Sequence, residues 1–188
     1  MIEVNLNGIT MIFKTSPTLF SPRCLDAGTN AMLSCVAFSQ NDKVLDLGCG
    51  YGIIGIYAAL LIGEQRVTMA DVDETAVAAA KENACLNGVP DVHIFQSDGL
   101  RSIDDAGYTI ILSNPPYHAD FSVAKHFIEK GFNRLVIGGK MVMVTKRKEW
   151  YKNKFIAVFG GVSVREIDGY YVFIAEKRSP SYATKASR

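Results

Sequence analysis

The sequence has 188 residues, of which 48% are hydrophobic and 21% are charged, with a net charge of +1. This composition indicates one globular domain of ordinary size and excludes a disordered chain. No apolar stretch reaches the length of a transmembrane helix and no secretory signal is recognisable, so we expect no membrane partner and a cytoplasmic location.

The chain begins with two runs that alternate apolar and polar residues, Ile2–Leu6 and Ile9–Phe13. Asn7-Gly8 between them is the dipeptide that most readily forms a two-residue hairpin turn. The sequence therefore predicts an N-terminal β-hairpin. A helix is expected next over Thr29–Phe38, with Thr29 or Asn30 as its N-cap.

From Lys43 onward, short apolar runs alternate with longer runs of helical character. Strands are expected at 44–47, 67–70, 93–96, 109–113 and 140–145, and helices at 53–62, 74–86, 123–135 and 151–159. Two alternating runs at 162–167 and 170–176 close the chain around a second hairpin dipeptide, Asp168-Gly169.

Strands alternating with helices are typical of a parallel sheet covered on both faces. The sequence therefore predicts an α/β, Rossmann-like fold of seven strands, mostly parallel, with a C-terminal antiparallel hairpin. We expect a single domain over 1–188, in which 1–40 form the hairpin and first helix, 41–178 the core and 179–188 a flexible tail.

The four cysteines, Cys24, Cys35, Cys49 and Cys85, are widely spaced and form no Cys-x-x-Cys pair. This spacing argues against a zinc site and against a disulfide framework. We expect small buried side chains in a reducing compartment and no metal.

A glycine-rich turn follows the first strand of the core, with glycines at 48, 50 and 52 that let the backbone approach a ligand closely. Such a turn also suits NAD, but Ile53 stands where the third glycine of the dinucleotide fingerprint is expected. Asp46 would repel a pyrophosphate and favour a cationic amino-acid group instead.

Two further strands end in carboxylates. Asp71 follows its strand directly and is expected to accept hydrogen bonds from a ribose diol, whereas Asp73 is also a candidate helix N-cap. Asp98, in the turn Ser97-Asp98-Gly99, is expected to accept from an adenine amine. Acids at three strand ends suit a neutral or cationic nucleoside, although each alone is also common in turns.

The fourth core strand ends in Asn114-Pro115-Pro116-Tyr117-His118. The Asn114 side-chain oxygen and the Pro115 carbonyl are placed to accept the two hydrogens of an amine on a planar ring, which would aim its lone pair. Tyr117 is expected to stack on that ring. The segment therefore predicts a catalytic site for a flat nitrogen nucleophile, against the alternative of a plain turn.

These motifs together resemble the class I S-adenosylmethionine-dependent methyltransferases that act on exocyclic or amide nitrogens. The form Ser113-Asn-Pro-Pro-Tyr-His, with the hairpin and the segment LFSPRCLDAGT before it, is similar to the small-domain ribosomal RNA guanine-N2 methyltransferase family. The resemblance covers nearly the whole chain.

The resemblance implies the seven-stranded methyltransferase fold, S-adenosylmethionine as cofactor and RNA as substrate. It implies that Asp46, Gly48 and Gly50 line the methionine part of the cofactor. Phe20 and the stretch 26–29 would cover the cofactor from the N-terminal side. The remaining cofactor-binding residues that it implies are Asp71 and Val72 for the ribose, Asp98 and Gly99 for the adenine, and Asn114.

Residues 140–188 carry eleven Lys and Arg against four Asp and Glu, so this part has a net charge of +7 and the rest of the chain −6. Lys146, Arg147 and Lys148 follow the fifth core strand at the ligand edge, where they would hold RNA phosphates. Alternatively, these three residues are simply the solvated start of the helix that follows. His118 is expected to contact substrate, with a general-base role as the second possibility.

The sequence predicts transfer of a methyl group to an exocyclic amine of a nucleobase, most of all guanine N2 in ribosomal RNA. An adenine in nucleic acid or a protein glutamine stays open as the acceptor, because each presents a planar amine. A non-catalytic cofactor- or RNA-binding module is a more distant alternative. The intact Asn114–Tyr117 segment disfavours it, because a degenerate segment is expected in such a module.

Overall fold

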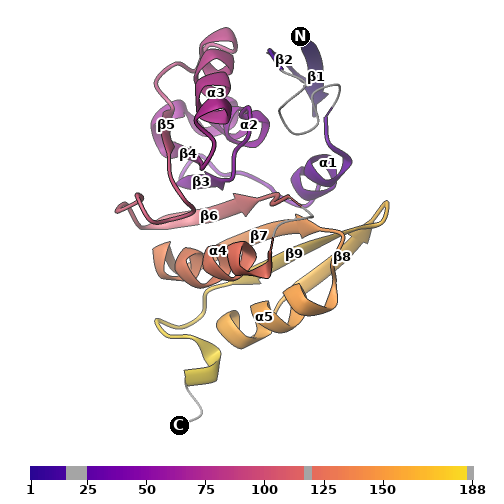
Figure 1. Cartoon of the computed structure of the whole chain (residues 1–188), viewed down its shortest axis with the longest axis vertical. Helices are drawn as coiled ribbons and strands as arrows, with labels where there is room; N and C mark the ends of the chain where they lie inside the picture. Colours follow the sequence, from indigo (N-terminus) through magenta and orange to yellow (C-terminus); the bar gives the residue numbers. More distant parts are fainter. Residues whose placement is uncertain (16–24, 117–119, 186–188) are drawn as a thin grey trace.

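A computed structural model describes residues 1–15, 25–116 and 120–185 of the chain. Its centre is a seven-stranded sheet in the order β5-β4-β3-β6-β7-β9-β8, whose helices cover both faces (Figure 1). The strands are β3 (Val44–Leu47), β4 (Val67–Asp71), β5 (His93–Gln96), β6 (Tyr108–Ser113), β7 (Leu135–Thr145), β8 (Ser163–Ile167) and β9 (Tyr170–Glu176).

The first five strands of this sheet run parallel, and β9 and β8 add an antiparallel hairpin at one edge. Asp168 and Gly169 both have positive φ, as the turn of that hairpin requires. All four residues of β3 are buried, because this central strand is covered on both faces. The predicted Rossmann-like class and the predicted C-terminal hairpin are confirmed.

Helices α2 (Ile53–Ile62) and α3 (Glu74–Leu86) cover one face of the sheet, and α4 (Phe121–Arg134) and α5 (Glu149–Phe159) cover the other. Two separate apolar clusters result, one on each face, because neighbouring strand residues point to opposite sides. A short 3₁₀ segment, η1 (Glu64–Arg66), links α2 to β4.

The N-terminal hairpin of β1 (Ile2–Leu6) and β2 (Ile9–Phe13) has the predicted bounds and register. Its buried side chains join the cluster around α2 and α3. Two asparagines of α3 and its C-cap hold the second strand and the residue after it. Asn87, the C-cap, bonds the N–H and carbonyl of Ile12, and Asn83 of α3 bonds the N–H and carbonyl of Lys14. The hairpin is therefore fixed to the helix that follows β4.

Helix α1 spans Ala27–Leu33, and the prediction of a helix over Thr29–Phe38 capped by Thr29 or Asn30 is wrong at both ends. Asp26 is the N-cap, and its carboxylate accepts the Thr29 N–H at 2.9 Å. The apolar residues between Leu33 and Phe38 have the spacing of a helix, but their backbone is not helical. They pack individually on the core, as Phe38 does on the edge of the Tyr57 ring.

Strand β7 begins at Leu135, five residues before the predicted start at Lys140. The Gly138 N–H donates to the Lys177 carbonyl and the Lys177 N–H donates to the Gly139 carbonyl, both at 2.8 Å. Val136 and Ile137 are apolar but exposed, and Gly138-Gly139 separates them from the buried apolar run after Lys140. The sequence therefore predicts a helix that reaches Leu135 and a strand that begins only at Lys140.

The last segment, for which the sequence predicts a flexible tail, contains the 3₁₀ turn η2 (Ala183–Lys185). Tyr182 packs edge-on against Phe132, and its hydroxyl donates to the Glu129 carbonyl at 2.8 Å. An aromatic side chain with a hydroxyl that finds a partner fixes this part of the segment to α4. Within the described residues, no helix has the length and apolar character needed to cross a membrane.

Candidate active site at the carboxyl ends of the parallel strands

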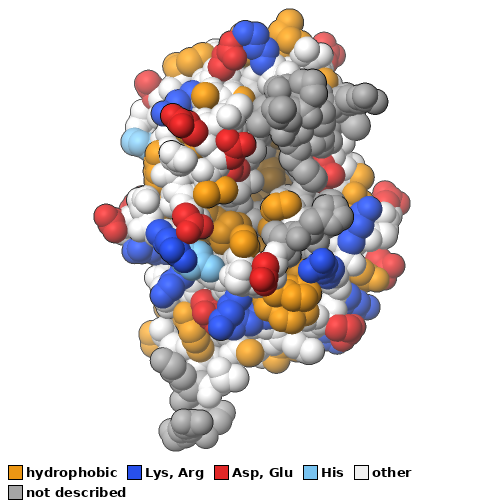
Figure 2. Space-filling model, in the orientation of Figure 1, with side chains coloured by type: hydrophobic (Ala, Val, Ile, Leu, Met, Phe, Trp, Pro, Cys, Tyr) orange, Lys and Arg blue, Asp and Glu red, His pale blue; other side chains and the backbone are white. Residues whose placement is uncertain are grey.

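A cavity of about 340 Å³ lies at the carboxyl ends of β3, β4, β5 and β6. The turns after these strands, the start of α1 and two apolar side chains of α4, Val123 and Phe127, form its wall. It is visible as a hollow near the centre of the face in Figure 2, with acidic side chains around it. Ligands of open parallel sheets bind at this edge.

The turn after β3 brings three glycines to the cavity wall. Gly50 has a φ of 54°, and its N–H donates to the Asp71 carboxylate at 2.8 Å. At Gly52, with a φ of 104°, a Cβ would lie 2.9 Å from the Ile56 Cδ1 atom and 3.0 Å from the Met69 Cε atom. The glycines therefore let α2 pack closely on β4 while the turn stays open toward a ligand.

Asp46 does not line the cavity. Its side chain is fully buried beneath the glycine-rich turn, where one carboxylate oxygen accepts the Gly55 N–H at 2.9 Å. The other oxygen is buried and has no hydrogen-bond partner among the described residues. Burial, with a smaller contribution from the negative charge of Asp71, raises the pKa of Asp46 to about 7.

The raised pKa of Asp46 predicts a stability that falls with pH. Because the folded protein holds the proton up to about pH 7 and the ordinary value is 3.8, unfolding releases a proton between these values. The contribution of Asp46 to the free energy of unfolding is therefore fully present below about pH 4. It is lost as the pH rises to 7, and the loss is at most about 4 kcal/mol.

Urea denaturation at a series of pH values measures this effect. Asp46→Asn keeps an acceptor for the Gly55 N–H and does not titrate. We expect it to match the wild type near pH 4 and to be the more stable protein at pH 8. Equal stabilities of the two proteins at both pH values would contradict the assignment.

Asp71, at the end of β4, is half-buried and lies in the cavity wall. Its two carboxylate oxygens accept the N–H groups of Gly50 and Asp73, at 2.8 and 3.0 Å. Backbone donors hold this carboxylate in place, and each oxygen retains a lone pair for a ligand hydroxyl. Val72 beside it is 61% exposed, an apolar side chain at the cavity rim.

The turn after β5 contributes Asp98 and Gly99 to the wall. Asp98 is exposed and forms a 3.2 Å ion pair with Arg101. A Cβ at Gly99 would lie 2.6 Å from the His126 ring, which accepts the Leu100 N–H at 3.2 Å. His126 of α4 therefore supports the shape of this turn and leaves no room for a side chain at 99.

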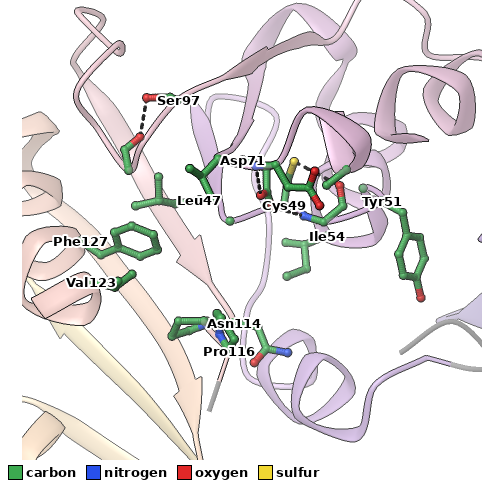
Figure 3. Close-up of a pocket in the computed structure, with 18 of the residues that line it drawn as sticks. Leu47, Cys49, Tyr51, Ile54, Asp71, Ser97, Asn114, Pro116, Val123 and Phe127 are labelled. Atoms are coloured by element: carbon green, nitrogen blue, oxygen red, sulfur yellow. Dashed lines mark hydrogen bonds between the residues drawn. The ribbon is translucent and has the colours of Figure 1, made fainter. Parts of the chain in front are cut away.

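Asn114 follows the last residue of β6 and lies in the cavity wall, in direct contact with the start of α1. Its Nδ2 atom donates to the Asp26 carboxylate at 2.8 Å and to the Thr29 hydroxyl oxygen at 2.9 Å. Its Oδ1 atom is buried and has no partner among the described residues. Figure 3 shows Asn114 and Pro116 on one side of the cavity and Asp71 on another.

A family model described as methyltransferase small domain matches residues 10–174. The chain belongs to this family. Its methyltransferases use S-adenosylmethionine, and the glycine-rich turn and the strand-end carboxylates are the parts of this chain that suit such a cofactor.

Relatives of this methyltransferase include proteins of known name in several bacteria. The uncharacterized protein YbxB of Bacillus subtilis is 33% identical over 88% of this chain and 85% of its own length. Ribosomal RNA large subunit methyltransferase G of Alteromonas mediterranea is 31% identical, over 89% of this chain and 43% of its own length. The chain thus spans less than half of that ribosomal RNA methyltransferase.

A solved structure supports the same grouping. The 16S rRNA N2 G1207 methyltransferase RsmC of T. thermophilus, in complex with AdoMet and guanosine, superposes with a TM-score of 0.85 at 25% identity. The match covers 94% of this methyltransferase and 50% of that chain. The seven-stranded methyltransferase fold predicted from the motifs is therefore confirmed.

The basic run after β7 lies outside the cavity wall of this methyltransferase. Lys146, Arg147 and Lys148 are exposed, and each cation lies over an aromatic ring: Tyr170, Phe121 and Tyr171, at 4.9, 4.8 and 5.2 Å. Phe121 also stacks on Trp150, with ring centroids 4.4 Å apart. In Figure 2, Lys and Arg side chains gather on the face below the hollow.

Phe20, Tyr117 and His118 lie outside the described residues, so their roles stay predictions. The wall contains residues that the motifs did not single out, among them Ser97, Val123 and Phe127. Ser97 is buried, and its hydroxyl donates to the Gly99 carbonyl at 2.8 Å. Val123 and Phe127 are four apart on α4, a spacing that places them on one face of a helix, but nothing in the sequence marks that face as part of a site.

Proposed function

We propose that this methyltransferase transfers a methyl group to an exocyclic amine of a nucleobase, with N2 of a guanine in ribosomal RNA as the favoured acceptor. The observation that carries the proposal is the buried, unpartnered Oδ1 atom of Asn114 in the wall of an acidic cavity. A buried acceptor without a donor loses free energy, so a ligand N–H at that place is favoured.

The donor set of the cavity fits S-adenosylmethionine. Four aspartates but no Lys, Arg or His occur among the described residues of its wall, which favours a cationic ligand and disfavours a phosphate. We assign Asp71 to the ribose hydroxyls, Asp98 and Gly99 to the adenine amine, and the turn at Gly48 and Gly50 to the methionine part.

When bound, S-adenosylmethionine supplies a methyl group on a positively charged sulfur. The residues of this chain prepare the nucleophile. Asn114 Oδ1 and the Pro115 carbonyl accept the two hydrogens of the amine, so that its lone pair is free to point away from both. As positive charge develops on the nitrogen, the same two acceptors stabilise it. Tyr117 would hold the base ring by stacking.

Two facts favour a guanine in ribosomal RNA over the other planar amines. A structural relative whose match covers 94% of this chain is a 16S rRNA N2 G1207 methyltransferase in complex with guanosine. The basic run of Lys146, Arg147 and Lys148 follows a strand whose end lies at the same edge of the sheet as Asn114. Phosphate contacts need such a surface, whereas a protein glutamine does not.

Product analysis tests the proposal. The protein is incubated with radiolabelled S-adenosylmethionine and ribosomes or ribosomal RNA from a strain that lacks its gene, and the RNA is digested to nucleosides. We expect the label in N2-methylguanosine. Label in N6-methyladenosine would move the acceptor to adenine, and label in protein would overturn the assignment to RNA.

The basic run gives a separate prediction for RNA binding. We expect Lys146→Ala combined with Lys148→Ala to raise the KM for RNA about tenfold near physiological salt. The slope of the logarithm of the binding constant against the logarithm of the salt concentration should become shallower, by the amount that about two phosphate contacts contribute. Cofactor affinity is measured by calorimetry with S-adenosylhomocysteine and should stay within twofold. The double variant Arg66→Ala with Lys81→Ala removes two exposed positive charges from η1 and α3 and serves as the control for general surface effects. An unchanged salt dependence would show that the run is only a solvated surface.

A further inference from the structure

The Asn114 amide makes two hydrogen bonds to α1, a helix far from it in sequence. Asp26 and Thr29 precede Asn114 by 88 and 85 residues, yet their oxygens lie 2.8 and 2.9 Å from its Nδ2 atom. Thr29 is 6% exposed and Asp26 is partly buried, so little water competes at this contact. The contact joins the first helix of the chain to the end of β6.

The chemistry of the partners decides which way the amide faces. A carboxylate only accepts hydrogen bonds, so the side of Asn114 that meets Asp26 has to be the –NH₂ group. The second hydrogen of that group goes to the Thr29 hydroxyl oxygen. With both hydrogens used, Oδ1 is the only polar atom of the side chain that remains for a ligand.

The opposite orientation of the amide would be costly. A rotation by half a turn would place Oδ1 against the Asp26 carboxylate, which repels it, and would break the hydrogen bond to that carboxylate. The Thr29 hydroxyl would then have to donate to Oδ1 instead of accepting. The rotation would also turn –NH₂ toward the place where the proposed acceptor amine presents its own N–H groups. Two donors facing each other cannot bond, so only one of the two orientations supports transfer.

The Asp26 carboxylate oxygen that meets Asn114 also accepts the Thr29 N–H at 2.9 Å, as the N-cap of α1. The cap therefore fixes the position of both acceptors at once. A charged acceptor on the –NH₂ side also polarises the amide and strengthens Oδ1 as an acceptor.

From these contacts we propose that Asp26 and Thr29 are positioning residues, which hold the Asn114 amide in the single orientation that accepts hydrogens from the methyl acceptor. The proposal rests on the proposed function, since it names residues that act through Asn114 in the same reaction. Neither residue has to touch the base.

Thr29→Val is the most direct test, because it removes the hydroxyl acceptor and keeps the shape of the side chain. We expect kcat to fall about tenfold, which corresponds to the loss of one buried hydrogen bond, while the KM for RNA changes less than twofold. Leu33→Ala, which loosens the packing of α1 without touching Asn114, is the matched control. It should lower thermal stability more than Thr29→Val does and leave kcat within twofold at a temperature where both variants are folded. If kcat falls in both variants in proportion to the loss of thermal stability, the proposal is overturned.

An exchange of donor and acceptor separates positioning from packing. Asn114→Asp alone sets two carboxylates at the contact, and we expect transfer to fall about a hundredfold. In the double variant Asp26→Asn with Asn114→Asp, the amide at 26 donates to the carboxylate at 114, whose second oxygen remains an acceptor. We expect at least about tenfold recovery relative to Asn114→Asp. No recovery would contradict the proposed role of Asp26.

A spectroscopic measurement tests the orientation without any reaction. In a ¹⁵N-labelled protein, the two side-chain N–H signals that disappear in Asn114→Ala belong to this amide, and we expect both to exchange slowly with solvent. Thr29→Val should make one of them exchange faster, whereas equal and fast exchange in the wild type would overturn the contact. If this protection is found but no nucleobase amine is methylated, the proposed function fails and the contact stands.

Discussion

Replacing Asn114 by alanine should reduce methyl transfer by about 10²- to 10³-fold, because the variant loses the acceptor that orients the amine and stabilises its developing charge. The dissociation constant of S-adenosylhomocysteine, measured by calorimetry, should change only a few fold. Asn114 lines the cavity at the end of β6, whereas the proposed ribose site at Asp71 lies at the end of β4.

Loss of both transfer and cofactor binding in Asn114→Ala would show that the residue is structural rather than catalytic. The control is Ser113→Ala at the preceding position. Its buried hydroxyl donates to the Leu47 carbonyl at 2.7 Å and does not line the cavity. We expect this variant to lose stability and to keep kcat close to that of the wild type.

Asn83→Ala should destabilise the protein by about 3 kcal/mol. The fully buried Asn83 side chain accepts the Lys14 N–H at 2.7 Å and donates to the carbonyls of Lys14 and Tyr51 at 3.0 and 2.9 Å. Alanine leaves these backbone groups without this partner where little water reaches them. The measurement is urea denaturation followed by circular dichroism.

Asn87→Ala is the matched control for this prediction. Asn87 is the C-cap of α3 and bonds the N–H and carbonyl of Ile12 at 3.0 and 2.8 Å, but at an exposed place. Because water can replace the lost bonds, we expect a loss of about 1 kcal/mol. Equal losses in the two variants would show that burial is not what makes Asn83 important. Tyr51 belongs to the cavity wall, so Asn83→Ala should also weaken cofactor binding.

Much of the fold is readable from the sequence for simple reasons. The alternation in residues 2–13 and the dipeptide Asn7-Gly8 specify a hairpin, and both turn residues adopt the positive φ that such a turn needs. The short apolar runs that follow match the strands within one residue at most ends, and Gly48, Asn114 and Asp168 mark where three of them stop. Strand β7 is the exception, since Gly138-Gly139 separates the apolar residues at its start from the buried run after Lys140.

The site was only partly predictable. Glycines and acids after successive strands must meet at one edge of a parallel sheet, so order alone predicts that Gly50, Asp71 and Asp98 lie in one cavity wall, as they do. Their roles toward a cofactor stay predictions. Asp46 was misplaced, because periodicity cannot show which way a residue points in a strand that is buried on both faces. The contact of Asp26 with Asn114 spans 88 residues, and no local pattern reports a hydrogen bond over that separation.

A crystal structure of the protein with S-adenosylmethionine and guanosine tests the central claim most directly. We predict the ribose hydroxyls on the Asp71 carboxylate, the adenine beside Asp98, and the guanosine amine within hydrogen-bond distance of Asn114 Oδ1. An empty cavity at saturating cofactor, or a phosphate group bound between these aspartates, would contradict the account.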